Sequence, residues 1–172
     1  MAKTVFITGG ARSGKSRLAE EIAEGLGNSL LYIATGQARD TEMAERIAAH
    51  RARRGEKWHT VEEPLRLCEA VREADGRFEA IMIDCVTLWL TNLLLTHDDA
   101  ERSLAEVCTL ADLLPELEKP VILVSNEVGM GIVPENALAR TFRDLAGRAN
   151  EILAAAADEV YVMFSGIPLR LK

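Results

Sequence analysis

Short runs of apolar residues alternate with helix-like segments along the whole chain. The strand-like runs cover residues 4–8, 30–34, 80–84, 120–125 and 160–164. The helix-like segments cover residues 15–26, 41–54, 87–96, 100–114 and 136–157, and a further helix starts near Pro64. Apolar strands that alternate with helices are typical of a parallel sheet covered by helices. The pattern therefore predicts an α/β protein with a mainly parallel sheet flanked by helices.

Two segments outside this alternation complete the expected fold. Residues 59–62 form a short extended stretch, and residues 167–171 follow Ser165 and Gly166. We expect the tail to turn back there as an antiparallel edge strand. The chain shows no repeat, low-complexity stretch or linker, and its 172 residues suit one hydrophobic core. A single domain over residues 1–172 is therefore expected.

Composition narrows the possible classes of function. The net charge is −7, from 20 basic and 27 acidic residues, and only 5% of the residues are aromatic. Duplex binding needs clustered cations and single-strand binding needs aromatic platforms, so no nucleic-acid partner is expected. No run approaches the roughly 20 apolar residues of a membrane span. Three cysteines without a CxxC spacing indicate reduced thiols, so we expect a cytoplasmic protein.

The strongest chemical signal follows the first predicted strand and precedes the first predicted helix. It matches the phosphate-loop pattern G-x-x-x-x-G-K-[ST] in full, at Gly9, Gly10, Ala11, Arg12, Ser13, Gly14, Lys15 and Ser16. Glycines allow backbone N–H groups to surround a phosphate, and the helix N-terminus adds partial positive charge. Lys15 is expected to reach the β- and γ-phosphates of a nucleotide, and the Ser16 hydroxyl is expected to bind Mg²⁺.

Two further positions lie at the ends of predicted strands. Asp84 closes an apolar strand, where P-loop proteins place the acid that holds the Mg²⁺ shell. Ala34, Thr35 and Gly36 end another strand, at the edge where ligands bind in open α/β sheets. A plain strand-to-helix turn explains these three residues equally well.

His50 lies on a strongly cationic predicted helix. At 100° per residue, Arg46, His50 and Arg53 share one face of that helix. Neighbouring guanidinium groups disfavour a further positive charge, so the imidazole would stay neutral and nucleophilic. Such a histidine could attack the α-phosphorus of a nucleotide, but the residues alone favour a packing role on a basic surface.

The loop over residues 125–136 follows the fourth of the main predicted strands. It contains Gly129, Gly131 and Pro134, and it is expected at the same sheet edge as the phosphate loop. It could contact the acceptor of a transferred group, or it could be only a rigid connection.

Several stretches together carry a resemblance to a known family. They cover residues 6–16, 32–35, 84–89 and 126–134, with shorter matches at 42–43, 46–47, 50–51, 143–144, 147 and 165–166. The string Asn-Glu-Val-Gly-Met-Gly-Ile-Val-Pro at 126–134 is far more specific than a phosphate loop. On these stretches the chain resembles the bifunctional adenosylcobinamide kinase/adenosylcobinamide-phosphate guanylyltransferases of cobalamin biosynthesis, over essentially its whole length.

The resemblance implies a RecA-like P-loop NTPase fold, a homotrimer and two reactions. In the first reaction, ATP or GTP phosphorylates the hydroxyl on the aminopropanol arm of adenosylcobinamide, a corrinoid. In the second reaction, GTP guanylylates a histidine, and the phosphorylated cobinamide takes the GMP to give adenosylcobinamide-GDP. The nucleophile corresponds to His50, which reverses the preference for a packing role. Some relatives have two adjacent histidines here, whereas this chain has Ala49 followed by His50.

The same likeness implies a set of residues that contact the nucleotide or its metal. The set contains the loop from Gly9 to Ser16 together with Ala34, Thr35, Gly36, Arg51, Ala52, Arg53, Arg54, Glu62 and Asp84. The assignments of Glu62 and of guanine rest on resemblance alone, because the chain has no N-K-x-D motif.

Two other functions remain open at this point. One is a P-loop kinase with a single activity on another small hydroxyl compound, in which His50 is structural. The other is a RecA-like, nucleotide-dependent ATPase module that responds to a macromolecule, which the acidic charge and the short chain disfavour.

Overall fold

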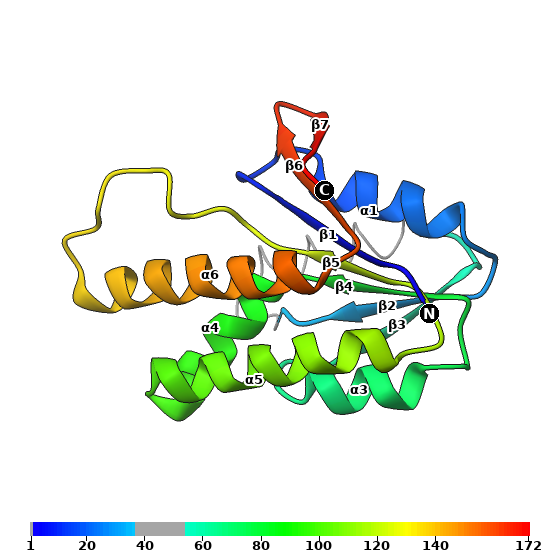
Figure 1. Cartoon of the computed structure of the whole chain (residues 1–172), viewed down its shortest axis with the longest axis horizontal. Helices are drawn as coiled ribbons and strands as arrows, with labels where there is room; N and C mark the ends of the chain where they lie inside the picture. The colour runs from blue at the N-terminus through cyan, green and yellow to red at the C-terminus, as the bar shows by residue number, and fades with distance from the viewer. Residues whose placement is uncertain (1, 37–53) are drawn as a thin grey trace.

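The computed structural model describes residues 2–36 and 54–172. Seven strands form one sheet in the order β3-β2-β4-β5-β1-β6-β7 (Figure 1). The strands are β1 (Thr4–Gly9), β2 (Leu30–Ala34), β3 (Trp58–Glu62), β4 (Ala80–Asp84), β5 (Val121–Val124), β6 (Glu159–Phe164) and β7 (Ile167–Arg170). The described helices are α1 (Lys15–Glu24), α3 (Leu67–Ala74), α4 (Val86–His97), α5 (Ala100–Leu113), the 3₁₀ turn Leu114–Glu116 and α6 (Ala137–Ala156).

All strand pairs of the sheet are parallel except the last. β6 and β7 pair antiparallel through the two-residue connection at Ser165 and Gly166. The expected α/β fold with a mainly parallel sheet and an antiparallel C-terminal edge strand is therefore confirmed.

The structure changes some of the expected boundaries. The extended stretch at 59–62 is a full strand that begins at Trp58 and pairs in parallel with β2. The first helix ends at Glu24, and the helix expected near Pro64 begins at Leu67. The predicted helix over 41–54 lies outside the described residues, except for Arg54.

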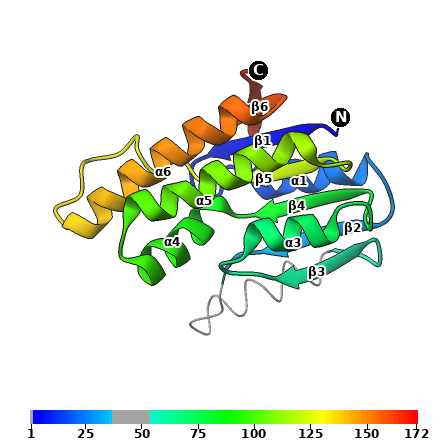
Figure 2. The same ribbon diagram turned by 60° about the horizontal axis from the view of Figure 1, so that its bottom comes forward.

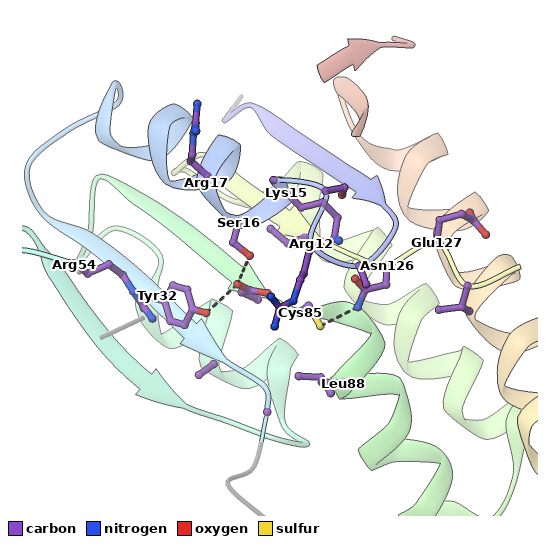
Figure 3. Close-up of a pocket in the computed structure, with 18 of the residues that line it drawn as sticks. Arg12, Lys15, Ser16, Arg17, Tyr32, Arg54, Cys85, Leu88, Asn126 and Glu127 are labelled. Atoms are coloured by element: carbon purple, nitrogen blue, oxygen red, sulfur yellow. Dashed lines mark hydrogen bonds between the residues drawn. The ribbon is translucent and has the colours of Figure 1, made fainter. Parts of the chain in front are cut away.

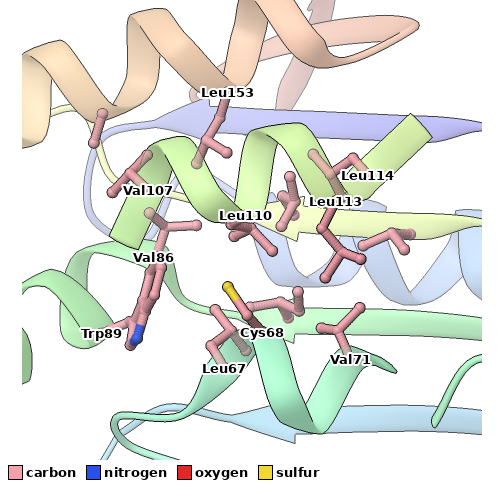
Figure 4. Packing of buried hydrophobic residues seen from close by; sticks show 14 of the residues in the cluster. Leu67, Cys68, Val71, Val86, Trp89, Val107, Leu110, Leu113, Leu114 and Leu153 are labelled. Carbon is pink, nitrogen blue, oxygen red and sulfur yellow. The ribbon is translucent and has the colours of Figure 1, made fainter. Parts of the chain in front are cut away.

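Helices cover both faces of the sheet. α1 packs on one face, where Ala19 and Ala23 meet Val5, Ile7 and other strand residues. α3, α4, α5 and α6 pack on the opposite face (Figures 1 and 2). This face forms the larger core, in which Val107, Leu110 and Leu153 lie close together (Figure 4). Within the described part of the chain, no helix has the length and apolar character needed to cross a membrane.

Parallel pairing brings the carboxyl ends of several strands to one edge. Glu62, Ala34, Asp84 and Val124 are successive register partners across β3, β2, β4 and β5. β5 in turn pairs with β1, which leads into the phosphate loop. The fold thus assembles the candidate residues from distant parts of the sequence at the edge where open α/β sheets bind ligands.

Candidate active site

A cavity of about 880 Å³ opens at this edge of the sheet (Figure 3). Its volume falls within the range of roughly 300–1,000 Å³ typical of small-molecule sites. Its lining comes from the phosphate loop, the start of α1, the ends of four strands and the segment after β5. The lining residues are Ala11, Arg12, Ser13, Gly14, Lys15, Ser16, Arg17, Tyr32, Ala34, Gly36, Arg54, Thr60, Glu62, Asp84, Cys85, Leu88, Val124, Asn126, Glu127 and Val128.

Two glycines shape the phosphate loop. Gly9 has φ +148°, and a Cβ at this position would lie 2.6 Å from the Met163 carbonyl oxygen of β6. Gly14 has φ +95°, in the region that L side chains rarely adopt. The loop is also tied to the β6–β7 connection, since the Gly166 N–H donates to the Ser13 carbonyl over 3.0 Å. Only glycine fits at position 9, because any side chain there would collide with β6.

The N-terminus of α1 faces the cavity without a side-chain cap. Gly14 is the N-cap residue and offers no side chain, so no side chain satisfies the first N–H groups of α1. By contrast, Asp99 caps α5 and Asn136 caps α6. Free N–H groups at a helix N-terminus carry partial positive charge and bind phosphate. The loop and the first turn of α1 together form a site suited to a polyphosphate.

Lys15 adds a full positive charge to this site. Its side chain is 7% exposed, and Nζ donates a 2.6 Å hydrogen bond to the Gly10 carbonyl. Burial lowers the pKa of Lys15 from its ordinary value, and the nearby Cys85 and Asp84 oppose that shift. A phosphate that replaced the carbonyl as the partner of Lys15 would stabilise the charged form.

Ser16 and Tyr32 both donate to one oxygen of Asp84. The Ser16 Oγ to Asp84 Oδ2 distance is 2.9 Å, and the Tyr32 hydroxyl lies 3.0 Å from the same oxygen (dashed lines in Figure 3). Burial, followed by the charge of Asp84, raises the pKa of Tyr32 far above its ordinary value. Tyr32 therefore stays a neutral donor that fixes the orientation of the carboxylate.

The donor set suits Mg²⁺. A hydroxyl and a carboxylate oxygen are hard ligands, and Mg²⁺ usually takes one or two carboxylates together with water and substrate phosphates. No group of three or more His, Cys, Asp or Glu side chains with metal-binding geometry occurs among residues 2–36 and 54–172. A cation held by Ser16 and Asp84 would thus depend on phosphate and water oxygens for its remaining ligands.

Arg54 stacks on the ring of Tyr32. Its guanidinium carbon lies 3.3 Å from the ring centroid, and Nε lies 3.9 Å from Glu20 Oε1 of α1. Stacking of this kind is favourable for an arginine and holds the planar group in place. Because Arg54 lines the cavity, its guanidinium can contact an anionic ligand there.

Thr35 is buried beneath the cavity wall, unlike most of the other predicted residues, which line the cavity. It is completely buried, and its Oγ1 donates to the Cys85 carbonyl at 2.6 Å and accepts from the Cys85 N–H at 2.9 Å. These bonds join the ends of β2 and β4, and Thr35 does not line the cavity. Cys85 does line it, but burial raises the pKa of its thiol to about 11, so the thiol is protonated and non-nucleophilic at neutral pH.

Most of the other predicted residues described by the structure meet around the cavity. Ala11 to Ser16, Ala34, Gly36, Arg54, Glu62 and Asp84 line it, whereas Gly10 lines a smaller neighbouring cavity. Gly9 contributes through its close approach to β6. His50, Arg51, Ala52 and Arg53 lie outside the described residues.

Sequence reasoning assigned no site role to several lining residues. They include Arg17, Tyr32, Thr60, Leu88, Asn126 and Glu127. In the sequence, Tyr32 differs from the rest of the apolar stretch 30–34 by its hydroxyl, and this difference could have indicated a role in the site. Asn126 and Glu127 belong to the loop for which contact with an acceptor remained open, and both now lie on the cavity wall.

Comparison with known proteins decides the family. A family model described as cobinamide kinase / cobinamide phosphate guanyltransferase matches residues 5–171. This chain belongs to that family. It is 48% identical over 167 residues to the bifunctional adenosylcobalamin biosynthesis protein CobP of Pseudomonas aeruginosa, covering 97% of this chain and 96% of that protein. It is 45% identical over 180 residues to the protein of the same description, CobU, of Escherichia coli, covering 98% and 99% of the two chains. The resemblance inferred from the sequence is confirmed.

Membership in the cobinamide kinase / cobinamide phosphate guanyltransferase family gives the cavity a chemical context. The kinase activity of this family requires a nucleoside triphosphate, and the phosphate loop, Lys15 and the Ser16–Asp84 pair have the chemistry that binding such a nucleotide needs. The match extends over both the phosphate loop and the segment after β5, so the relatives resemble this chain on both sides of the cavity.

Proposed function

We propose that this chain phosphorylates adenosylcobinamide and then transfers GMP from GTP to the product. One observation supports the kinase reaction. The uncapped N-terminus of α1, the buried Lys15 and the Ser16–Asp84 pair all face the same cavity. Membership in the family, over residues 5–171, carries the corrinoid substrate and the second reaction.

In the kinase reaction, the phosphate loop and the first turn of α1 bind the β- and γ-phosphates. Lys15 offsets the charge that develops on the transferring group and on the departing diphosphate. Ser16 and Asp84 would hold Mg²⁺, which supplies charge neutralisation and orientation of the phosphates when bound. Tyr32 keeps the Asp84 carboxylate in the orientation that this role requires.

In the guanylyltransferase reaction, we assign His50 as the nucleophile. Its imidazole attacks the α-phosphorus of GTP, the bond to the β-phosphate breaks, and pyrophosphate leaves. A phosphate oxygen of the phosphorylated cobinamide then attacks the same phosphorus, which releases the imidazole and gives adenosylcobinamide-GDP. Arg51, Ala52, Arg53 and Arg54 would border the nucleotide, with Arg54 already fixed against Tyr32. Glu62 would contribute from the far side of the cavity.

Three further assignments belong to the proposal. The enzyme acts in the cytoplasm, binds no nucleic acid and forms a homotrimer. Exposed apolar side chains at the C-terminal edge support self-association, since Ile167, Leu169 and Leu171 are all more than half exposed. Light scattering at several protein concentrations would test the trimer, and a stable monomer would overturn it.

The decisive experiment for the bifunctional proposal uses α-labelled GTP without an acceptor. Wild-type protein should retain label covalently, and His50→Ala should abolish labelling while the affinity for GTP stays within about two-fold. His59→Ala, at an exposed position on β3, is the matched control and should label normally. Absence of label on the wild-type protein, or persistence of label on His50→Ala, would contradict the assigned transferase chemistry.

A further inference from the structure

A second, smaller cavity adjoins the nucleotide cavity. It measures about 360 Å³, and Ala11, Arg12, Ser13 and Glu127 line both cavities. The large cavity contains the charged Lys15 and Asp84, whereas the small one is completed mainly by Met130, Met163 and Phe164. The phosphate loop and Glu127 therefore border both cavities, and the walls that belong to the small cavity alone are mainly apolar.

Glu127 is held firmly at this boundary. Its N–H donates to the Gly9 carbonyl over 2.9 Å, and its Oε1 accepts from the Gly129 N–H over 2.8 Å. Arg143 of α6 donates to the Gly129 carbonyl at 2.7 Å, and Asn150 donates to the Asn126 carbonyl at 3.2 Å. Within the described part of the chain, Oε2 makes no hydrogen bond. The backbone around Glu127 is thus fixed while one carboxylate oxygen remains available.

Position in the sheet separates Glu127 from the other acids of the cavity wall. Glu127 follows β5, which lies directly beside β1 and its phosphate loop. Glu62 ends β3, four strands from β1, which at a strand spacing of about 4.8 Å is a lateral separation of roughly 19 Å. Asp84 already accepts hydrogen bonds from Ser16 and Tyr32 on one oxygen. Asp84 is committed to Ser16, Tyr32 and the proposed Mg²⁺ site, so Glu127 is the described acid of the cavity wall that lies beside the loop and has no other assigned role.

The geometry points to Glu127 as the general base of the kinase reaction, with the acceptor's hydroxyl arm entering through the small cavity. This inference rests on the proposed kinase function. The acceptor oxygen attacks the γ-phosphorus, and the bond from that phosphorus to the β–γ bridging oxygen breaks. The diphosphate leaves with the bonding electron pair, and the hydroxyl proton passes to Glu127 Oε2, which later returns it to water. Met130, Met163 and Phe164 suit the hydrocarbon part of the acceptor's hydroxyl arm.

Glu127→Gln tests the role of the carboxylate with little change in shape. The amide oxygen can still accept from the Gly129 N–H, so the loop should keep its position. Loss of a general base should lower the kcat for cobinamide phosphorylation by at least about 100-fold. The dissociation constant for GTP and the covalent labelling by α-labelled GTP should stay within about two-fold of wild type. Glu135→Gln makes the same change at an exposed position of the same loop and should leave kcat unaltered.

The outcomes of this experiment are separable. Wild-type protein that fails to phosphorylate cobinamide overturns the proposed kinase function itself. Normal wild-type turnover with a Glu127→Gln rate within two-fold overturns the assignment of the base only. Equal losses of phosphorylation and covalent labelling would also overturn it, because Glu127 would then serve the nucleotide site.

Met130→Asp tests the path of the acceptor. Met130 lines the small cavity, so an added charge there should raise the KM for cobinamide at least five-fold and leave the KM for the nucleotide unchanged. Ile132→Asp is the matched control, since Ile132 is 97% exposed and does not line either cavity. Equal KM values for cobinamide in the two variants would overturn the entry path.

Discussion

Ser16 Oγ donates a 2.9 Å hydrogen bond to Asp84 Oδ2, joining the first turn of α1 to the last residue of β4. The two residues are 68 positions apart in the chain, and the parallel sheet brings them together. We propose that this hydroxyl and carboxylate, at the mouth of the phosphate loop, would form the protein's share of a Mg²⁺ site.

Asp84→Asn should therefore impair the metal-dependent chemistry. The amide keeps the shape of the side chain but removes the charge that attracts the cation. We expect kcat for phosphorylation to fall on the order of 100-fold or more, because the metal supplies several kcal/mol of charge stabilisation. Titration of activity with MgCl₂ is the measurement, and the variant should need more Mg²⁺ for half-maximal rate. Asp112→Asn, at an exposed position of α5, controls for loss of one negative charge. An unchanged Mg²⁺ requirement in Asp84→Asn would count against the site.

Tyr32→Phe should show a smaller effect of the same kind. The change removes the 3.0 Å hydrogen bond to Asp84 and keeps the ring under the Arg54 guanidinium. One lost hydrogen bond to a charged group corresponds to about 1.5–3 kcal/mol. We expect the Mg²⁺ concentration for half-maximal rate to rise about ten-fold, with a smaller change in the KM of the nucleotide.

Tyr161→Phe is the matched control for Tyr32→Phe. Tyr161 lies on β6, and its hydroxyl donates to Glu159 at 3.2 Å, outside the cavity lining. Activity and Mg²⁺ dependence should match wild type in this variant. If Tyr32→Phe behaved identically, the role of Tyr32 in orienting Asp84 would be wrong.

Lys15→Ala should nearly abolish phosphorylation. The ammonium group is the buried cation of the phosphate loop, and its loss removes charge stabilisation from the transferring phosphoryl group. We expect kcat/KM to fall by about 10³-fold or more in a coupled assay of nucleoside diphosphate release. Lys57→Ala removes an exposed lysine and should not change the rate. Turnover of Lys15→Ala close to wild type would contradict the role assigned to this lysine.

The sheet could be predicted from the sequence because its strands are almost entirely apolar. Residues 30–34 and 80–84 stand out between polar segments, and both strands have these bounds in the structure. The stretch around Val61 is harder to recognise, since β3 is an edge strand with a largely exposed pattern. Edge strands lack the apolar neighbours that impose a hydrophobic run, so their sequence carries less information.

The residues of the candidate site also differ in how well the sequence predicts them. The phosphate loop is recognisable because its chemistry requires glycines at particular positions, as the contact of Gly9 with Met163 shows. The hydrogen bond from Tyr32 to Asp84 joins two strands, and the sequence does not state which strands are neighbours. The hydrogen bonds between Thr35 and Cys85 also depend on which strands are neighbours, so the sequence does not reveal them either. Residues that act through tertiary contacts need the topology, whereas residues that act through local backbone shape do not.

Cys68 should make the stability of the fold depend on pH in alkaline solution. It is 5% exposed in the core between α3 and α5, and burial, helped by Glu106 and Glu69, raises the pKa of its thiol from 9.0 to about 11. Between those values the unfolded chain loses a proton that the folded protein keeps. The unfolded state then binds fewer protons, so the free energy of unfolding must fall as pH rises from about 9 to 11.

Denaturant unfolding at a series of pH values measures this contribution. Over these two pH units, one thiol can change the free energy of unfolding by at most about 2–3 kcal/mol. Cys68→Ala will be less stable overall, because it leaves a cavity, but its stability should decline less steeply than that of wild type over this range. Comparing slopes cancels the contributions of the other groups, Cys85 included. Cys108→Ala, at an exposed position of α5, should keep the wild-type slope. Parallel curves for wild type and Cys68→Ala would mean that the Cys68 thiol titrates alike in the folded and unfolded states.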